Sequence, residues 1–128
     1  MSAGAAPERA AVILVVEDER PVRQIMERAL TRNGYRVVAA ESADEALSVA
    51  AHHVTIDLLI TDIVMRGMNG RELATVMRRD RPELQVLYVS GFTQKQTGLD
   101  DPALAGSFLQ KPFGLDELVQ QVARMLAS

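Results

Sequence analysis

Cysteine is absent from the 128 residues of this chain. Its absence excludes a disulfide framework, a thiolate nucleophile and any metal site built on cysteine sulfur. Because a chain without cysteine suits a reducing compartment, we expect a cytoplasmic location.

Long hydrophobic runs are also absent, and none approaches the roughly 20 residues that a membrane-spanning helix requires. Residues 1–10 lack the basic start and apolar stretch of a signal peptide, and their alanine, glycine and proline content predicts a flexible lead. Residues 11–128 are enough for one domain with a core of its own. We expect no membrane association.

Positive charge is not in excess. The chain has 14 lysines and arginines against 17 aspartates and glutamates, a formal net charge of -3 and a pI near 5.4. Direct nucleic-acid binding is therefore not expected, because neutralising phosphates needs clustered basic residues.

Short apolar runs of strand length alternate with segments of helical periodicity. Strands are predicted over residues 12–16, 35–40, 57–61, 84–89 and 107–110. A first helix is predicted from Pro21 to Asn33, and a second begins at a capping box formed by Ser42 and Glu45. A third helix ends before Pro82, and the last runs from Leu115 to the C-terminus. Only short turns are predicted between Gly91 and Gly106. Five strands and five helical segments predict an α/β, doubly wound parallel sheet covered on both faces.

Acidic residues follow two of the predicted strands, and a lysine follows a third. Glu17 and Asp18 come after the first run, Asp62 after the third, and Lys111 after the fifth. Parallel strands would bring all four to the carboxyl edge of the sheet, where such sheets bind ligands. Crowded carboxylates favour a hard cation such as Mg²⁺, so the group indicates a metal-assisted phosphoryl acceptor. The alternative for the acidic pair is a helix N-cap.

Four segments together, Ile13–Glu19, Leu58–Met65, Val89–Gly91 and Lys111–Phe113, resemble the receiver domain of two-component response regulators. The resemblance covers residues 10 to 127. It implies a flavodoxin-like (βα)5 fold with strand order 2-1-3-4-5. It also implies a signalling domain that assists its own phosphorylation and dephosphorylation rather than an enzyme.

The resemblance implies that Asp62 is the phosphoacceptor. A carboxylate is ionised at neutral pH and needs no base to act as a nucleophile. Asp18 and Asp62 would bind Mg²⁺ directly, with the backbone carbonyl of Val64 as a third ligand, and Glu17 would act through a metal-bound water.

Lys111, Ser90 and Phe108 complete the implied site. Lys111 would pair with Asp62 and then with the phosphoryl group, and the bond between Lys111 and Pro112 is expected to be cis. Ser90 would bind a phosphoryl oxygen, and Phe108 would be the switch aromatic that moves with it. The alternatives are a solvated lysine, a turn-forming serine and a plain core phenylalanine.

The implied donor is the phosphohistidine of a sensor histidine kinase or of a histidine phosphotransfer protein. The output would be a conformational change of the weak fourth helix, expected between Gly91 and Gly106, with the fifth strand and the fifth, last helix. A downstream protein target would bind this face, or a homodimer would use it. The segments around Val86–Phe92 and Phe108–Phe113 look most like receivers of hybrid sensor kinases.

Several positions depart from the common receiver pattern. Arg66 replaces a proline, and Asn69 replaces an aspartate before Gly70. Val64 and Phe92, which flank the path of a hydrolytic water, are apolar and predict slow loss of phosphate.

Two other classes of protein are alternatives to the receiver. A pseudo-receiver that only binds a partner is disfavoured by the intact acidic group and by Lys111. A Mg²⁺-dependent phosphatase of the haloacid-dehalogenase type needs a second aspartate where Val64 stands. His52 and His53 are expected to be loop residues rather than phosphohistidines.

Overall fold

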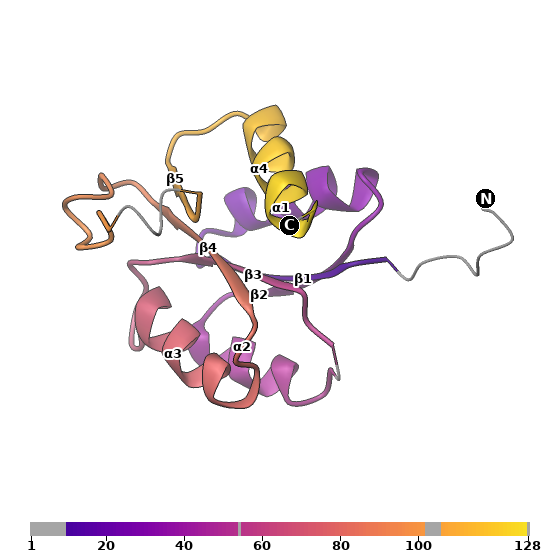
Figure 1. The fold of residues 1–128 in the computed structure, drawn as a ribbon, viewed down its shortest axis with the longest axis horizontal. Coiled ribbons are helices and arrows are strands. Elements are labelled where there is room, and N and C mark those ends of the chain that lie inside the picture. The colour runs from indigo at the N-terminus through magenta and orange to yellow at the C-terminus, as the bar shows by residue number, and fades with distance from the viewer. Residues whose placement is uncertain (1–9, 54, 102–105, 128) are drawn as a thin grey trace, which may run out of the picture.

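The computed structural model describes residues 10–53, 55–101 and 106–127, so residues 1–9 of the predicted lead (residues 1–10) lie outside the described range. Five parallel strands form one sheet in the order β2-β1-β3-β4-β5, as predicted (Figure 1). The strands are β1 (Val12–Val16), β2 (Arg36–Ala40), β3 (Leu58–Asp62), β4 (Gln85–Ser90) and β5 (Phe108–Gln110), and the helices are α1 (Arg20–Arg32), α2 (Ala43–Ala50), α3 (Gly70–Asp80) and α4 (Leu115–Ala127).

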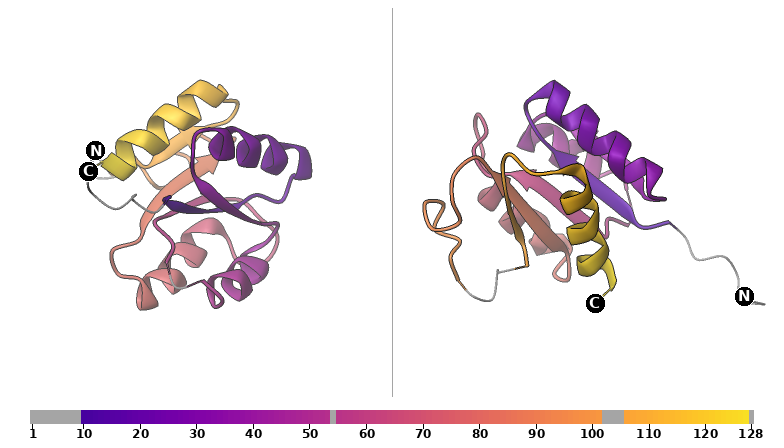
Figure 2. Two further views of the ribbon diagram at one scale, coloured as in Figure 1. Left: turned by 90° about the vertical axis from the view of Figure 1, so that its right-hand side faces the viewer. Right: turned by 90° about the horizontal axis from the view of Figure 1, so that it is seen from above.

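The sheet lies between two helical layers, with α1 and α4 on one face and α2 and α3 on the other (Figures 1 and 2). Alternate residues of β1 serve the two layers. Leu14 and Val16 pack into the core under α2 and α3, whereas Ile13 and Val15 pack into the core under α1 and α4. Both faces of the central strands are therefore buried, which explains their continuous apolar runs. Within the described ranges, none of the helices combines the length and apolarity needed to cross a membrane.

The ladder between β3 and β4 extends one residue beyond the predicted strands. Asp62 pairs with Val89, and Ser90 pairs with Gln110 of β5, so both polar residues end a strand instead of following it. Backbone hydrogen bonding determines where these strands end, and the apolar composition of the sequence does not predict these hydrogen bonds. Residues 91–101 contain bends and a short turn at residues 94–98, as predicted, and residues 102–105 lie outside the described range. The last helix of the sequence prediction is thus α4.

The capping box predicted at the start of α2 is only half correct. Ser42 Oγ accepts a hydrogen bond from the Glu45 amide, but the Glu45 carboxylate accepts from the amide of Glu41 rather than that of Ser42. The complete capping box is at α3, where Asn69 and Glu72 satisfy each other's backbone amides.

The start of α3 packs directly against the end of β3. The Gly70 amide donates to the Ile63 carbonyl at 2.9 Å, and a Cβ atom on Gly70 would lie 2.2 Å from the Asp62 carbonyl oxygen. Only glycine permits this approach, so Gly70 couples the position of α3 to the backbone of Asp62.

We predict that Gly70→Ala lowers the free energy of unfolding by about 1–3 kcal/mol, because the added methyl group overpacks against backbone. Urea denaturation measures the change. Gly91→Ala is the matched control, since a Cβ there meets no atom within 4 Å. Equal stability of the two variants would show that α3 moves away from β3 without cost.

Candidate functional site

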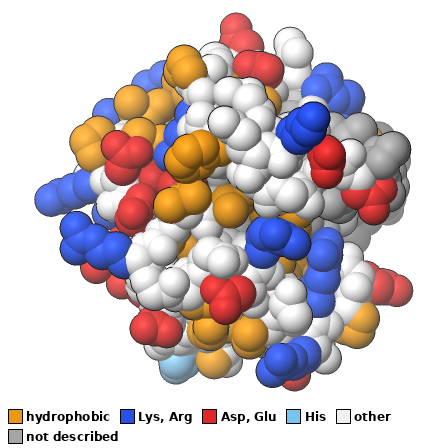
Figure 3. Space-filling view, turned by 90° about the vertical axis from the view of Figure 1, so that its left-hand side faces the viewer, with side chains coloured by type: hydrophobic (Ala, Val, Ile, Leu, Met, Phe, Trp, Pro, Cys, Tyr) orange, Lys and Arg blue, Asp and Glu red, His pale blue; other side chains and the backbone are white. Residues whose placement is uncertain are grey.

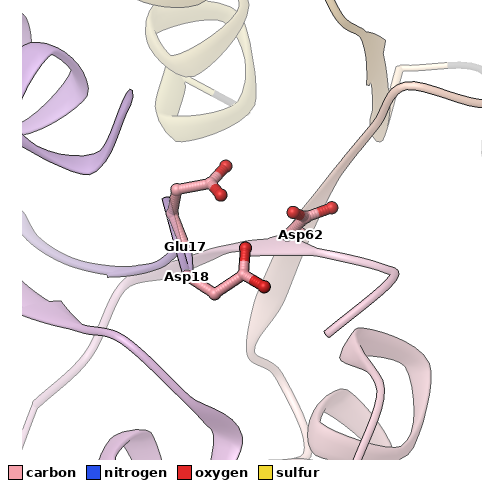
Figure 4. Close-up of side chains that lie close together, drawn as sticks. All are labelled: Glu17, Asp18 and Asp62. Atoms are coloured by element: carbon pink, nitrogen blue, oxygen red, sulfur yellow. The ribbon is translucent and has the colours of Figure 1, made fainter. Parts of the chain in front are cut away.

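Three carboxylates meet at the carboxyl edge of the sheet. The register pairs Val16 with Thr61, so the next residues, Glu17 and Asp62, lie side by side at the ends of β1 and β3. One oxygen each of Glu17, Asp18 and Asp62 lies within 4.8 Å of the others, and Figure 4 shows the three side chains pointing into the same space. The predicted meeting of these residues is confirmed.

The three carboxylates differ in burial. Glu17 is 1% exposed and Asp62 is 7% exposed, whereas Asp18 is open to solvent. Burial raises the pKa of both Glu17 and Asp62, and hydrogen bonding to Lys111 opposes this rise in each case. The two buried groups therefore carry their negative charge at a cost, which a cation at the site would offset.

Lys111 lies between the buried carboxylates. Its Nζ is 2.6 Å from Glu17 Oε1, 3.3 Å from Asp62 Oδ2 and 3.5 Å from Glu19 Oε1. Burial lowers the pKa of Lys111, but the hydrogen bond to Glu17 and the charge of Asp62 outweigh it, so the net pKa is raised. The ammonium group is thus firmly charged, which disagrees with the solvated-lysine alternative.

The donor set fits Mg²⁺. It consists of carboxylate oxygens alone, and three negative charges face one ammonium, so the group retains an excess of negative charge. Asp18 makes no side-chain hydrogen bond or ion pair within the described part of the chain, so its oxygens are available to a metal. Val64 follows in the loop after β3, and its side chain is 56% exposed.

The hydroxyl of Ser90 is engaged locally in this structure. Ser90 is fully buried, its Oγ accepts a hydrogen bond from the Phe92 amide at 3.0 Å, and its carbonyl accepts one from the Lys111 amide at 2.8 Å. This is the turn-forming alternative, and it also joins Ser90 to the backbone of Lys111. The Lys111–Pro112 bond is cis, as predicted.

Phe108 pairs with Tyr88 in the sheet and is half-buried against the core under α2 and α3. Its side chain is therefore neither fully packed nor fully exposed. His52 and His53 form the turn after α2, and His52 Nδ1 contacts the Ser48 carbonyl oxygen, as expected for loop residues.

Two residues of the site were not identified from the sequence. Arg23 Nη1 donates to the Glu17 carbonyl at 2.8 Å, and Gly70 packs on the Asp62 carbonyl as described above. Glu19, the residue after the acidic pair, also contacts Lys111. The available sequence signal for Arg23 was a basic residue five positions after Asp18.

The face that carries the site is chemically mixed (Figure 3). Acidic side chains lie beside hydrophobic ones there, with lysines and arginines around them. A hollow of about 330 Å³ is lined by Asp18, Glu41, Ser42 and Arg66. A second hollow, of about 260 Å³, is apolar and is lined by Val22, Ile25, Met26, Lys111, Pro112, Phe113 and Leu115.

Comparison with known proteins gives one consistent family. A family model described as the response regulator receiver domain matches residues 13–123. The chain is 37% identical over 118 residues to the sensor kinase CckA of Brucella abortus, covering 91% of this chain and 12% of that kinase. It is 34% identical over 117 residues to the response regulator MprA of a Mycobacterium species, covering 89% of this chain and 50% of MprA.

The comparison with solved structures indicates the same family. The crystal structure of the receiver domain of the hybrid histidine kinase CckA has a TM-score of 0.76 and 36% identity, covering 91% of this chain and 99% of that one. The response regulator TrrA of Thermotoga maritima, in complex with Mg²⁺-BeF, has a TM-score of 0.76 and 30% identity with the same coverages. The chain thus spans at most half of the two curated relatives, but nearly all of these two structures.

We predict that Asp62→Asn raises the thermal midpoint of the protein by a few degrees at pH 7 in EDTA. A carboxyl group whose pKa is higher folded than unfolded destabilises the fold when ionised. The stability gained in Asp62→Asn is present above the raised pKa of Asp62. It disappears as the pH falls from this raised pKa to the ordinary pKa of an aspartate.

Thermal unfolding between pH 3 and pH 8 measures this difference. Glu83→Gln, at an exposed loop position, is the control and is expected to change stability by no more than about 0.5 kcal/mol. An Asp62→Asn protein less stable than the wild type at pH 7 would contradict the charge argument.

Proposed function

Because this chain belongs to the response regulator receiver domain family, we propose that Asp62 accepts a phosphoryl group from a phosphohistidine. In this transfer the phosphorus–nitrogen bond of the donor breaks as an oxygen–phosphorus bond forms to the Asp62 carboxylate. The histidine nitrogen takes the electron pair of the broken bond. The observation that carries the proposal is the convergence of Glu17, Asp18 and Asp62 with Lys111 at one sheet edge.

Mg²⁺ fits this site as the resident metal. Asp18 and Asp62 would hold it directly, with the Val64 carbonyl as a further ligand and Glu17 acting through a water molecule. When bound, the ion supplies positive charge against the phosphoryl oxygens. The Mg²⁺-BeF complex of the similar protein TrrA supports this assignment.

Lys111 and Ser90 are proposed to bind the phosphoryl group. Lys111 Nζ already lies 3.3 Å from Asp62 Oδ2, so it reaches an oxygen attached there. Ser90 Oγ, which accepts a hydrogen bond from the Phe92 amide in this structure, would donate its hydroxyl hydrogen to a phosphoryl oxygen. Phe108, half-buried nearby on β5, would respond as the switch. The segment 91–106, β5 and α4 would then carry the output to a protein target or to a second copy.

The donor is proposed to be a sensor histidine kinase or a histidine phosphotransfer protein. A protein that delivers a phosphohistidine to Asp62 must contact the surface around it, and the apolar hollow beside Lys111 offers exposed Ile25 and Leu115 for that contact. We also propose that the receiver domain extends over residues 11–128, a range that contains the family match at residues 13–123. No observation in the described residues favours the haloacid-dehalogenase alternative, and the experiment below separates the pseudo-receiver.

We predict that acetyl phosphate with Mg²⁺ adds one phosphoryl group to the wild-type protein and none to Asp62→Asn. Intact-mass spectrometry measures the adduct, with EDTA as the metal-free control. No adduct on the wild type, despite Mg²⁺ binding, would favour the pseudo-receiver. An equal adduct on both proteins would refute the assignment of Asp62.

We further predict that the phosphorylated protein persists for minutes or longer and that Val64→Asn shortens its lifetime several-fold. Val64 and Phe92 are 56% and 51% exposed beside the site and are apolar, so they do not orient an attacking water. Decay of the adduct is followed by mass after removal of acetyl phosphate. Ile25→Asn, which replaces a side chain that is 48% exposed, is the control. Decay within seconds, or slower decay in Val64→Asn, would contradict the prediction.

A further inference from the structure

Arg23 connects α1 to the carboxyl end of β1. Its side chain is half-buried, and its Nη1 donates to the Glu17 carbonyl oxygen at 2.8 Å. Its own backbone amide donates to the Glu19 carbonyl at 2.9 Å, within the first turn of α1. Arg23 is therefore held through its backbone in α1, and its guanidinium group contacts the acidic turn of residues 17–19.

The Arg23 contact completes the fixation of Glu17. The Glu17 amide donates to the Ala40 carbonyl at 3.1 Å, and its carboxylate oxygens contact Lys111 and the Glu19 amide. With the carbonyl also bound by Arg23, every polar group of Glu17 has a partner. The peptide unit that joins Glu17 to Asp18 is planar and rigid, so a hydrogen bond to its carbonyl oxygen also fixes the position of the Asp18 nitrogen and Cα.

Asp18 depends on this backbone for its orientation. Its exposed side chain has no hydrogen bond or ion pair within the described residues that would hold it in place. A metal ligand that lacks such support is aimed by its main chain alone, and groups that orient ligands strongly affect metal affinity.

We propose that Arg23 is a positioning residue for the metal-binding site, acting through the Glu17 carbonyl on the direction of the Asp18 carboxylate. This inference rests on the proposed function, since it assumes that Asp18 is a Mg²⁺ ligand. In this role Arg23 would contact neither the metal nor the phosphoryl group.

The test compares Arg23→Gln with Arg20→Gln. Arg20 lies in the same first turn of α1 and is exposed, so its replacement removes the same charge without removing a contact to Glu17. Calorimetry measures the Mg²⁺ dissociation constant of each protein. Phosphorylation by acetyl phosphate gives the half-saturating Mg²⁺ concentration and the rate at saturating Mg²⁺.

Arg23→Gln is expected to raise the Mg²⁺ dissociation constant about ten-fold while changing the rate at saturating Mg²⁺ less than about two-fold. Arg23→Lys, which retains a donor for the carbonyl, is expected to recover part of the affinity. Arg20→Gln is expected to stay within about two-fold of the wild type, because salt screens the charge of an exposed side chain.

A purely structural role would lower the thermal midpoint of Arg23→Gln and leave Mg²⁺ affinity unchanged, and that result overturns the proposal. Equal losses in Arg23→Gln and Arg20→Gln also overturn it, because charge alone would then explain the effect. If Arg23→Gln does not fold, Arg23→Met retains the packing of the stem and carries the same expectation. A wild-type protein that binds no Mg²⁺ refutes the proposed function instead.

Discussion

Negative charge concentrated at the ends of two neighbouring strands is the constraint on which this site depends. The register of β1 and β3 holds Glu17 beside Asp62, and Asp18 lies next along the chain. Their mutual repulsion would separate flexible groups, but the strands beneath are paired and buried on both faces. The fold therefore supplies the rigidity, and Lys111 supplies only part of the opposing charge.

Burial makes this arrangement both costly and useful. Glu17 and Asp62 are nearly inaccessible, so each has a raised pKa and each gains from any added positive charge. Asp18 remains exposed and gives solvent species a route to the buried pair. A site that is one-sidedly open and short of positive charge suits a reaction in which a metal ion and a phosphoryl group arrive from solvent.

The sequence was sufficient to predict the sheet, its order and the residues that meet at its edge. Continuous apolar runs followed by Glu17, Asp62 and Lys111 carry that information locally, and the resemblance to receivers supplied the order. Contacts that depend on the mutual placement of distant segments were not predictable. Gly70 against the Asp62 carbonyl and Arg23 on the Glu17 carbonyl are examples, because each joins an element to a backbone atom of another. The misplaced capping box shows a related limit, since Ser42 and Asn69 carry similar motifs and only the structure separates their partners.

Under the proposed function, Ser90 and Lys111 would transmit chemistry at Asp62 through this rigid frame. The Lys111 amide is bonded to the Ser90 carbonyl, and the Lys111 ammonium contacts Glu17 and Asp62, so one residue spans the ends of β1, β3 and β4. The Ser90 hydroxyl, by contrast, has the amide of Phe92 in the adjacent turn as its one hydrogen-bond partner among the described residues. Under the proposed function, a phosphoryl oxygen on Asp62 would accept a hydrogen bond from this hydroxyl and draw Ser90 toward it. Under the proposed function, movement is therefore directed into the turns after β4, while the core strands keep the acidic site in place.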